Sequence, residues 1–174
     1  MFYTALFPSP LGELTLAAQD DVLVGLWLPG QKYVGGGLAG DWKRDDTLPV
    51  FAQTKDWLRR YFAGEQPPID AIPLSPIGSP FRQRVWRALR EIPYGQVTTY
   101  GVLAKALAEE KGLPSMSAQA IGGAVGHNPI SIIIPCHRVV GANGSLTGYA
   151  GGIDKKVQLL TLEGVDVSRF YLPK

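Results

Sequence analysis

A proline-rich segment near the middle of the chain limits the possible folds more than any other feature. Residues 65–80 contain five prolines, with Gly78 among them. Proline donates no backbone hydrogen bond and fixes one backbone angle, so neither a long helix nor a central strand can run through this stretch. We therefore expect two domains, residues 1–77 and 78–174, joined by a linker at about residues 65–80.

The two parts of the chain carry opposite charge. Residues 1–77 contain 6 Lys or Arg and 9 Asp or Glu, whereas residues 78–174 contain 11 and 6, so the net charges are −3 and +5. This split favours a second domain that binds a polyanion, with random surface variation as the alternative. No apolar run approaches the ~20 residues of a membrane helix, and the first ten residues lack the features of a signal peptide.

The first part predicts a small α/β domain. Residues 12–18 and 22–28 have the pattern of two antiparallel strands joined by a tight turn, and residues 50–62 that of an amphipathic helix packed on them. The glycine-rich stretch around residues 35–40 lacks the lysine of a phosphate-binding loop, so we interpret it as flexible. Nothing in this part indicates catalysis.

The second part predicts a helix-turn-helix. Ser79 and Pro80 begin one helix, whose four arginines either keep it hydrated or face phosphates. Thr99 can cap a further helix over residues 100–108, and a polar connection leads to a short helix over residues 117–125. This last helix has almost no long side chains. We expect it to contact DNA without reading its sequence, through Ser117, Ala118, Gln119, Ala120, Gly122 and Gly123.

The chain contains one cysteine, Cys136, which excludes an intramolecular disulfide, a redox pair and a cysteine-rich metal site. A reducing cytoplasm fits this count. Cys136 follows a buried β-type segment, residues 132–134, and Pro135 places it at a turn. Either it is inert apolar filling, or the neighbouring His137 and Arg138 lower the pKa of its thiol.

Elimination narrows the chemistry of Cys136. Side chains of adjacent residues point in opposite directions in an extended chain, so pairing with His137 needs a turn or a water molecule. A redox role needs a second thiol, and a metal site needs ligands that are missing before His127. What remains is a thiolate that attacks an electrophile, with no encoded group to release it.

Several motifs resemble the O6-alkylguanine-DNA alkyltransferase family. They are Ser79-Pro80-Phe81, Val85-Trp86, Ile92-Pro93-Tyr94-Gly95, Tyr100, Gly122-Gly123-Ala124, Asn128-Pro129, Pro135-Cys136-His137-Arg138-Val139 and Tyr149-Ala150-Gly151-Gly152. The resemblance covers residues 78–164 closely and the first part loosely. It implies a ribonuclease-H-like α/β N-terminal domain and a mainly α, winged-helix-like C-terminal domain with a helix-turn-helix.

The resemblance also implies the reaction. Direct-reversal DNA repair would transfer an alkyl group, typically methyl, irreversibly from O6-alkylguanine to Cys136, with O4-alkylthymine as a further candidate substrate. The chain would be a single-turnover methylated-DNA–protein-cysteine S-methyltransferase without a cofactor. Cys136 would be the nucleophile, His137 would deprotonate it through water, and Glu163 would orient His137. Tyr100 would assist nucleotide rotation and protonate the leaving guanine, and Asn128 would hold the turn around the cysteine.

For the substrate, the resemblance implies a pocket formed by the Val139 carbonyl, the Ala150 amide, Tyr149 and Ser131. Arg138 joins the expected DNA contacts. The partner would be double-stranded DNA with alkylated bases, entered from the minor groove without sequence preference. We expect a monomeric, cytoplasmic protein that binds no membrane.

Three features depart from the family pattern. Gln119 stands where the family usually has an arginine that fills the gap left by the flipped base. The connection at residues 109–117 is several residues longer than usual. The zinc site of some members is not supported, because the first part contains no Cys or His, so we expect no metal. The alternative function is that of the alkyltransferase-like branch, lesion binding with slow transfer, although those proteins lack the cysteine.

Overall fold

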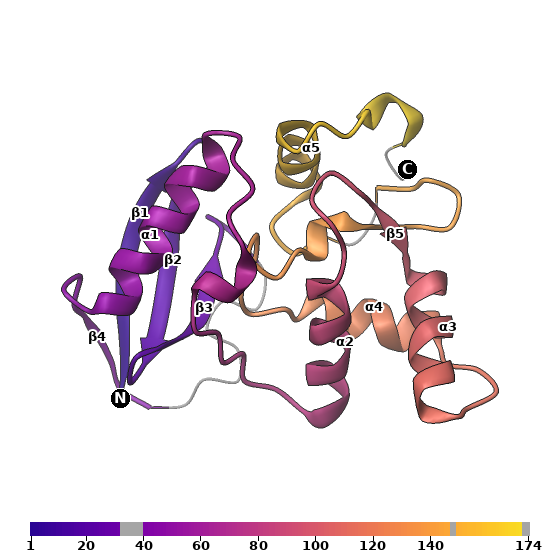
Figure 1. The fold of residues 1–174 in the computed structure, drawn as a ribbon, viewed down its shortest axis with the longest axis horizontal. Helices are drawn as coiled ribbons and strands as arrows, with labels where there is room; N and C mark the ends of the chain where they lie inside the picture. The colour runs from indigo at the N-terminus through magenta and orange to yellow at the C-terminus, as the bar shows by residue number, and fades with distance from the viewer. Residues whose placement is uncertain (32–39, 147–148, 172–174) are drawn as a thin grey trace. The chain divides into compact units, whose positions relative to one another are not determined.

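The computed structural model describes residues 1–31, 40–146 and 149–171, and the chain forms two compact units (Figure 1). The first unit contains Met1–Ile77 and Pro129–Ile133, and the second contains Gly78–Asn128 and Ile134–Lys174. The boundary after Ile77 lies within the proline-rich segment. Most of the glycine-rich stretch that we interpreted as flexible lies outside the described residues.

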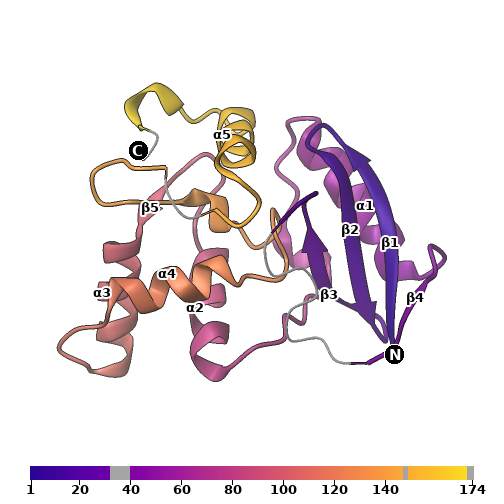
Figure 2. The same ribbon diagram turned by 180° about the vertical axis from the view of Figure 1, so that it is seen from behind.

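The first unit is a four-stranded sheet covered on one face by a helix (Figure 2). Its elements are β1 (Phe2–Ser9), β2 (Gly12–Gln19), β3 (Val22–Trp27), β4 (Trp42–Arg44) and α1 (Pro49–Phe62). The strand order is β3-β2-β1-β4, with β4 parallel to β1 and the other pairs antiparallel. α1 buries Phe51, Trp57 and Leu58 on its inner face. The two predicted strands correspond to β2 and β3, while β1 and β4 were not predicted.

The outer edge of β3 carries two segments that are distant in sequence. Leu23 exchanges backbone hydrogen bonds with Pro73 and Ser75, and Leu26 does so with Pro129 and Ser131, at 2.8–3.0 Å. Both prolines act only as acceptors, which an edge position permits. The proline-rich segment is therefore held to the sheet, and the residues just before the cysteine turn belong to the first unit.

The second unit is mainly helical. Its elements are α2 (Pro80–Arg90), β5 (Thr98–Thr99), α3 (Tyr100–Lys111), α4 (Ala118–Gly126), η2 (Cys136–Arg138), β6 (Val139–Val140), α5 (Ile153–Leu162) and η3 (Val167–Arg169). Ser79, Thr99 and Ser117 cap α2, α3 and α4 with their hydroxyl groups. The caps at Ser79 and Thr99 were predicted, whereas Ser117 was expected inside its helix. These three helices pack on one another, and the Trp86 indole donates to the Ala124 carbonyl at 2.8 Å.

Two sequence predictions, one in this unit and one at its boundary with the first unit, are wrong in detail. α3 continues to Lys111, beyond the predicted residue 108, and ends at Gly112, which has a φ of 69°. Residues 132–134 are buried but form a turn rather than a β-type segment, and Ile132 has a φ of 71°. A short apolar run reveals burial but not backbone conformation, because packing alone can hold such residues inside a turn.

Candidate active site

Cys136 lies at the start of η2 and is buried. The Asn128 side-chain amide donates to the Ile134 carbonyl at 2.8 Å and also hydrogen-bonds the Cys136 side chain, so Asn128 spans the turn that presents the thiol. Burial raises the pKa of the thiol, and Asn128 and the positive charge of Lys156 oppose this effect only in part. The predicted lowering by His137 and Arg138 is therefore wrong for this structure, because desolvation outweighs nearby charge.

His137 and Glu163 form a buried hydrogen-bonded pair. His137 Nε2 lies 2.6 Å from Glu163 Oε2. Burial lowers the pKa of His137, while hydrogen bonds from His137 and Arg138 hold the pKa of Glu163 well below its ordinary value despite its burial. A neutral imidazole must donate from Nε2 to the ionised carboxylate, which leaves a lone pair on Nδ1. Nδ1 is buried and has no hydrogen-bond partner among the described residues.

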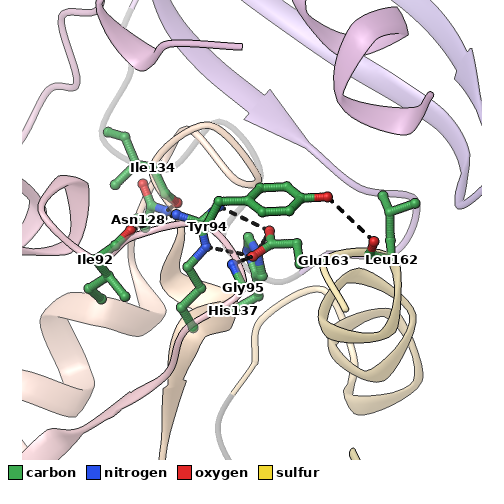
Figure 3. Close-up of polar contacts among 9 residues, drawn as sticks. Ile92, Tyr94, Gly95, Asn128, Ile134, His137, Leu162 and Glu163 are labelled. Atoms are coloured by element: carbon green, nitrogen blue, oxygen red, sulfur yellow. Dashed lines mark hydrogen bonds and ion pairs between the residues drawn. The ribbon is translucent and has the colours of Figure 1, made fainter. Parts of the chain in front are cut away.

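Arg138 is a buried partner of Glu163. Its Nε and Nη2 donate to the two carboxylate oxygens at 2.8 and 3.1 Å, and Nη1 donates to the Ile92 carbonyl at 2.7 Å. The guanidinium carbon lies 5.7 Å from the centre of the Tyr94 ring, and the Gly95 amide donates to Glu163 (Figure 3). With a side chain only 7% exposed, Arg138 is not placed for the predicted DNA contact. It holds the carboxylate that orients His137.

Tyr100, the first residue of α3, lies between α4 and the cysteine. A Cβ atom added to Gly122 would lie 3.9 Å from the Tyr100 ring, which is ordinary van der Waals contact, so the ring lies against α4 without requiring a glycine there. Burial, with a smaller effect of the charge on Cys136, raises the pKa of Tyr100 to about 12. The hydroxyl therefore stays protonated at neutral pH, in the form that can donate a proton.

The residues expected to bind the substrate come from both units. Val139 in β6 and Tyr149 are buried, and Ala150 is half-buried, all in the second unit. Ser131 belongs to the first unit, where its hydroxyl donates to Gln31 at 3.0 Å. The role of Ser131 in the pocket stays a prediction.

The expected DNA-contacting residues lie at the surface of α4. Ser117, Ala118, Gln119, Ala120 and Gly123 are exposed, and Gly122 is half-buried. The Ser117 hydroxyl accepts a hydrogen bond from the Ala120 amide, so it serves mainly as the helix cap. A Cβ atom on Gly123 would meet nothing within 4 Å, so internal packing does not explain that glycine. The result is a smooth, uncharged helical surface.

Sequence reasoning missed Lys156 and the roles of Tyr94 and Gly95. Lys156 is fully buried on the face of α5 that also contains Leu159 and Leu160, and Glu163 follows the helix as its C-cap. A charged residue at the spacing of an apolar face is the signal that could have revealed it. Tyr94 and Gly95 were noted only as part of a motif, because nothing local indicates that they surround a carboxylate.

The buried Glu163–His137 pair next to a single cysteine, in a unit with a helix-turn-helix, defines a class of protein: a DNA-binding protein with thiol chemistry. No helix among the described residues has the length and apolar character needed to cross a membrane. Nor do three His, Cys, Asp or Glu side chains gather as a metal site in that part of the chain.

Two family models match almost the whole chain. The ribonuclease-like domain of 6-O-methylguanine DNA methyltransferase matches residues 2–76, and its DNA binding domain matches residues 80–165. The chain belongs to this family. These matches confirm the predicted two-domain fold class, a ribonuclease-like α/β domain followed by a mainly helical DNA-binding domain.

Known proteins are similar to this chain over most of their lengths. The chain is 41% identical over 165 residues to the methylated-DNA–protein-cysteine methyltransferase of Haemophilus influenzae, covering 95% of this chain and 87% of the relative. It is 48% identical over 155 residues to that of Mycolicibacterium paratuberculosis, covering 89% and 88%. The crystal structure of Mycobacterium tuberculosis OGT in complex with DNA has a TM-score of 0.76 and 44% identity, covering 97% of this chain and 94% of that one.

Proposed function

We propose that this chain takes the alkyl group of O6-alkylguanine in DNA onto Cys136, once per molecule. As a member of its family it is a methylated-DNA–protein-cysteine methyltransferase that repairs DNA by direct reversal. The observation that carries the assignment of Cys136 is the arrangement beside it: a neutral His137 is held through Nε2 by an ionised Glu163, and its Nδ1 keeps a free lone pair. The names of the relatives support transfer over lesion binding alone.

His137 acts as the general base. Its Nδ1 accepts the thiol proton through a water molecule, because successive residues of a helical turn such as η2 do not face each other. Glu163 stabilises the imidazolium that forms, and Arg138 fixes both oxygens of Glu163. The resting thiol is protonated, since burial raises the pKa of Cys136. The base is therefore needed when substrate is bound.

Tyr100 acts as the proton donor to the leaving guanine. A guanine that gains a proton as the carbon–oxygen bond breaks is a better leaving group. The pKa of Tyr100 is raised to about 12, so the donor form persists at physiological pH. The Val139 carbonyl and the Ala150 amide would bind the guanine edge, with Tyr149 lining the pocket.

DNA binds along the exposed face of α4. Small residues let the helix approach a narrow minor groove, and the absence of Arg or Asn from this helix gives little means of reading base sequence. The alkylated nucleotide must leave the stack to reach a buried thiol, which costs a few kcal/mol. Gln119 lies in the first turn of α4, at the position where the family usually has an arginine. We assign to Gln119 the role of filling the gap that the flipped base leaves.

The protein works as a monomer in the cytoplasm. Single-turnover transfer needs one thiol and one DNA site, and each chain contains one cysteine. The reducing compartment keeps that thiol free before it meets damage.

The test is a stoichiometric transfer assay with a duplex containing O6-methylguanine. Mass spectrometry of the protein should show at most one added methyl group, located on Cys136. Cys136→Ala should abolish transfer yet bind the duplex with wild-type affinity, which separates DNA binding from chemistry. Repeated turnover, or methylation at another residue, would overturn the proposal. Binding without transfer by the wild-type protein would establish the lesion-binding alternative.

A further inference from the structure

Lys156 is a buried charged residue that the proposed chemistry does not use. It lies on α5 one turn after Gly152, and its side chain is 0% exposed. Its ammonium group donates a short hydrogen bond to the Val139 carbonyl. α5 packs against η2, so this ammonium lies next to the segment that contains Cys136.

The burial of this ammonium is costly. An ammonium group that leaves water favours its neutral form unless an opposite charge compensates. Burial lowers the pKa of Lys156 to about 8, and the charged form of Cys136 is the group that raises it again. The effect is mutual, because Lys156 also lowers the pKa of Cys136 against the effect of burial.

We propose that Lys156 is a positioning residue for the alkyl transfer: its buried ammonium stabilises the Cys136 thiolate as it forms and at the same time holds the Val139 carbonyl in place. The inference rests on the proposed function, in which Cys136 is the nucleophile and the Val139 carbonyl binds the guanine. One cation thereby connects the attacking atom to an atom that positions the target.

The chemical step balances without any proton from Lys156. The sulfur–carbon bond forms as the bond between the methyl carbon and guanine O6 breaks, and the electron pair of the broken bond stays on the guanine. The thiol proton passes through water to His137, and Tyr100 supplies the proton that the guanine gains. The negative charge passes from the sulfur to the guanine and, once the guanine is protonated, to the Tyr100 oxygen, which regains a proton from water while His137 returns its own to water. The ammonium stabilises the sulfur before the transfer.

Other titratable and charged groups lie around Lys156 and Cys136, and they affect the pH dependence of the Cys136 reaction. On η2, both Cys136 and His137 lie within the electrostatic influence of Lys156. From α3, Tyr100 faces Cys136, while Arg138 and Glu163 act on His137. His137 titrates on the acid side, because burial lowers its pKa, so an effect of Lys156 is sought from neutral to alkaline pH.

The first experiment uses the full-length protein with Lys156→Met, Lys156→Arg and the control Lys155→Met. Lys155 precedes Lys156 on α5, but its ammonium lies 3.9 Å from Asp154. Iodoacetamide reacts with the single cysteine, and its rate is measured against pH. Lys156→Met should move the inflection upward by about one pH unit or more. Lys156→Arg should restore part of the shift, and Lys155→Met should leave the profile unchanged.

Single-turnover transfer from an O6-methylguanine duplex gives the second measurement. At saturating DNA and neutral pH, Lys156→Met should slow transfer about tenfold or more while the Kd for DNA stays within about twofold. A merely structural role would weaken binding and transfer together. An unchanged iodoacetamide profile in folded Lys156→Met would overturn the proposal.

A reciprocal measurement does not depend on any Lys156 variant folding. In lysine labelled with carbon-13 at Cε, the alkaline end of the Lys156 titration should come at lower pH in Cys136→Ala than in the wild type, because the two groups titrate as a coupled pair and the thiolate that forms at alkaline pH is gone. Equal values would overturn the proposal. Failure of wild-type Cys136 to accept methyl would instead overturn the proposed function, and the iodoacetamide and NMR results would still report on the Lys156–Cys136 pair.

Discussion

The surface of α4 and the surroundings of Cys136 lie in the same unit and are built in opposite ways. The exposed face of α4 has one amide, Gln119, and otherwise small, uncharged residues. Around Cys136, four charged or titratable side chains are buried together: His137, Arg138, Lys156 and Glu163. The positive charge of this unit is thus partly inside it, near the thiol, and not on the helix expected to meet DNA.

The difference reflects what each region must do. Charges act strongly on a thiol only where water is excluded, since water screens them at a surface. A helix that enters a narrow groove gains more from small size than from charge at its tip. Net charge per domain therefore indicated a polyanion partner correctly but did not say which residues face it.

The largest expected effect comes from Glu163→Gln, which keeps the shape of the side chain and removes the charge. Arg138 is then buried without its carboxylate, and His137 loses the group that stabilises its protonated form. We expect single-turnover transfer to fall about 100-fold and the free energy of unfolding to fall by about 3–5 kcal/mol. Rapid-quench transfer and urea denaturation measure the two effects.

Glu110→Gln is the matched control for that variant. Glu110 pairs with Arg84 at 3.1 Å, but its side chain is 61% exposed. An exposed ion pair contributes at most about 1 kcal/mol, so stability and transfer should barely change. Equal losses in the two variants would show that burial does not distinguish the two carboxylates.

The next effect is a pH dependence of stability caused by Lys156. Its pKa is about 8 in the folded protein, and ~10.4 is expected in the unfolded chain. Between these values the unfolded state binds more protons, so stability rises with pH. The free energy of unfolding of the wild type, relative to Lys156→Met, should increase by as much as ~3 kcal/mol across this window. Chemical denaturation at a series of pH values measures it, and a flat difference would contradict a buried ammonium.

The smallest effect concerns α4. Gln119→Arg adds a cation to the uncharged surface and should tighten binding to duplex DNA by about fivefold, with the slope of log K against log salt steeper by up to ~0.9. Fluorescence anisotropy at several salt concentrations measures both. Gln158→Arg adds the same charge at an exposed position of α5 and serves as control. If both variants bind more tightly to the same extent, net charge and not the position on α4 is responsible.

Much of the fold followed from local signals. The caps at Ser79 and Thr99 depend on a hydroxyl and the amide three residues later, so short stretches contain the information. The partners of the Arg138 and Ser131 side chains could not be predicted from such local signals. Arg138 was expected at the DNA because it is basic and follows the cysteine, yet its partner Glu163 is 25 residues away. Ser131 pairs with Gln31, 100 residues earlier.

The residues alone determined the division at the prolines, the signals that begin the helices, the presence of a single cysteine and, through motifs, the family. Tertiary structure decided which charges are buried. Burial raises the pKa of the Cys136 thiol, which the sequence predicted to be lowered. Arg138 hydrogen-bonds Glu163, and Lys156, on the apolar face of α5, hydrogen-bonds the Val139 carbonyl near the cysteine. The reason is physical: composition and spacing specify which groups are present, but the strength of a charge depends on its distance from water and from its partners.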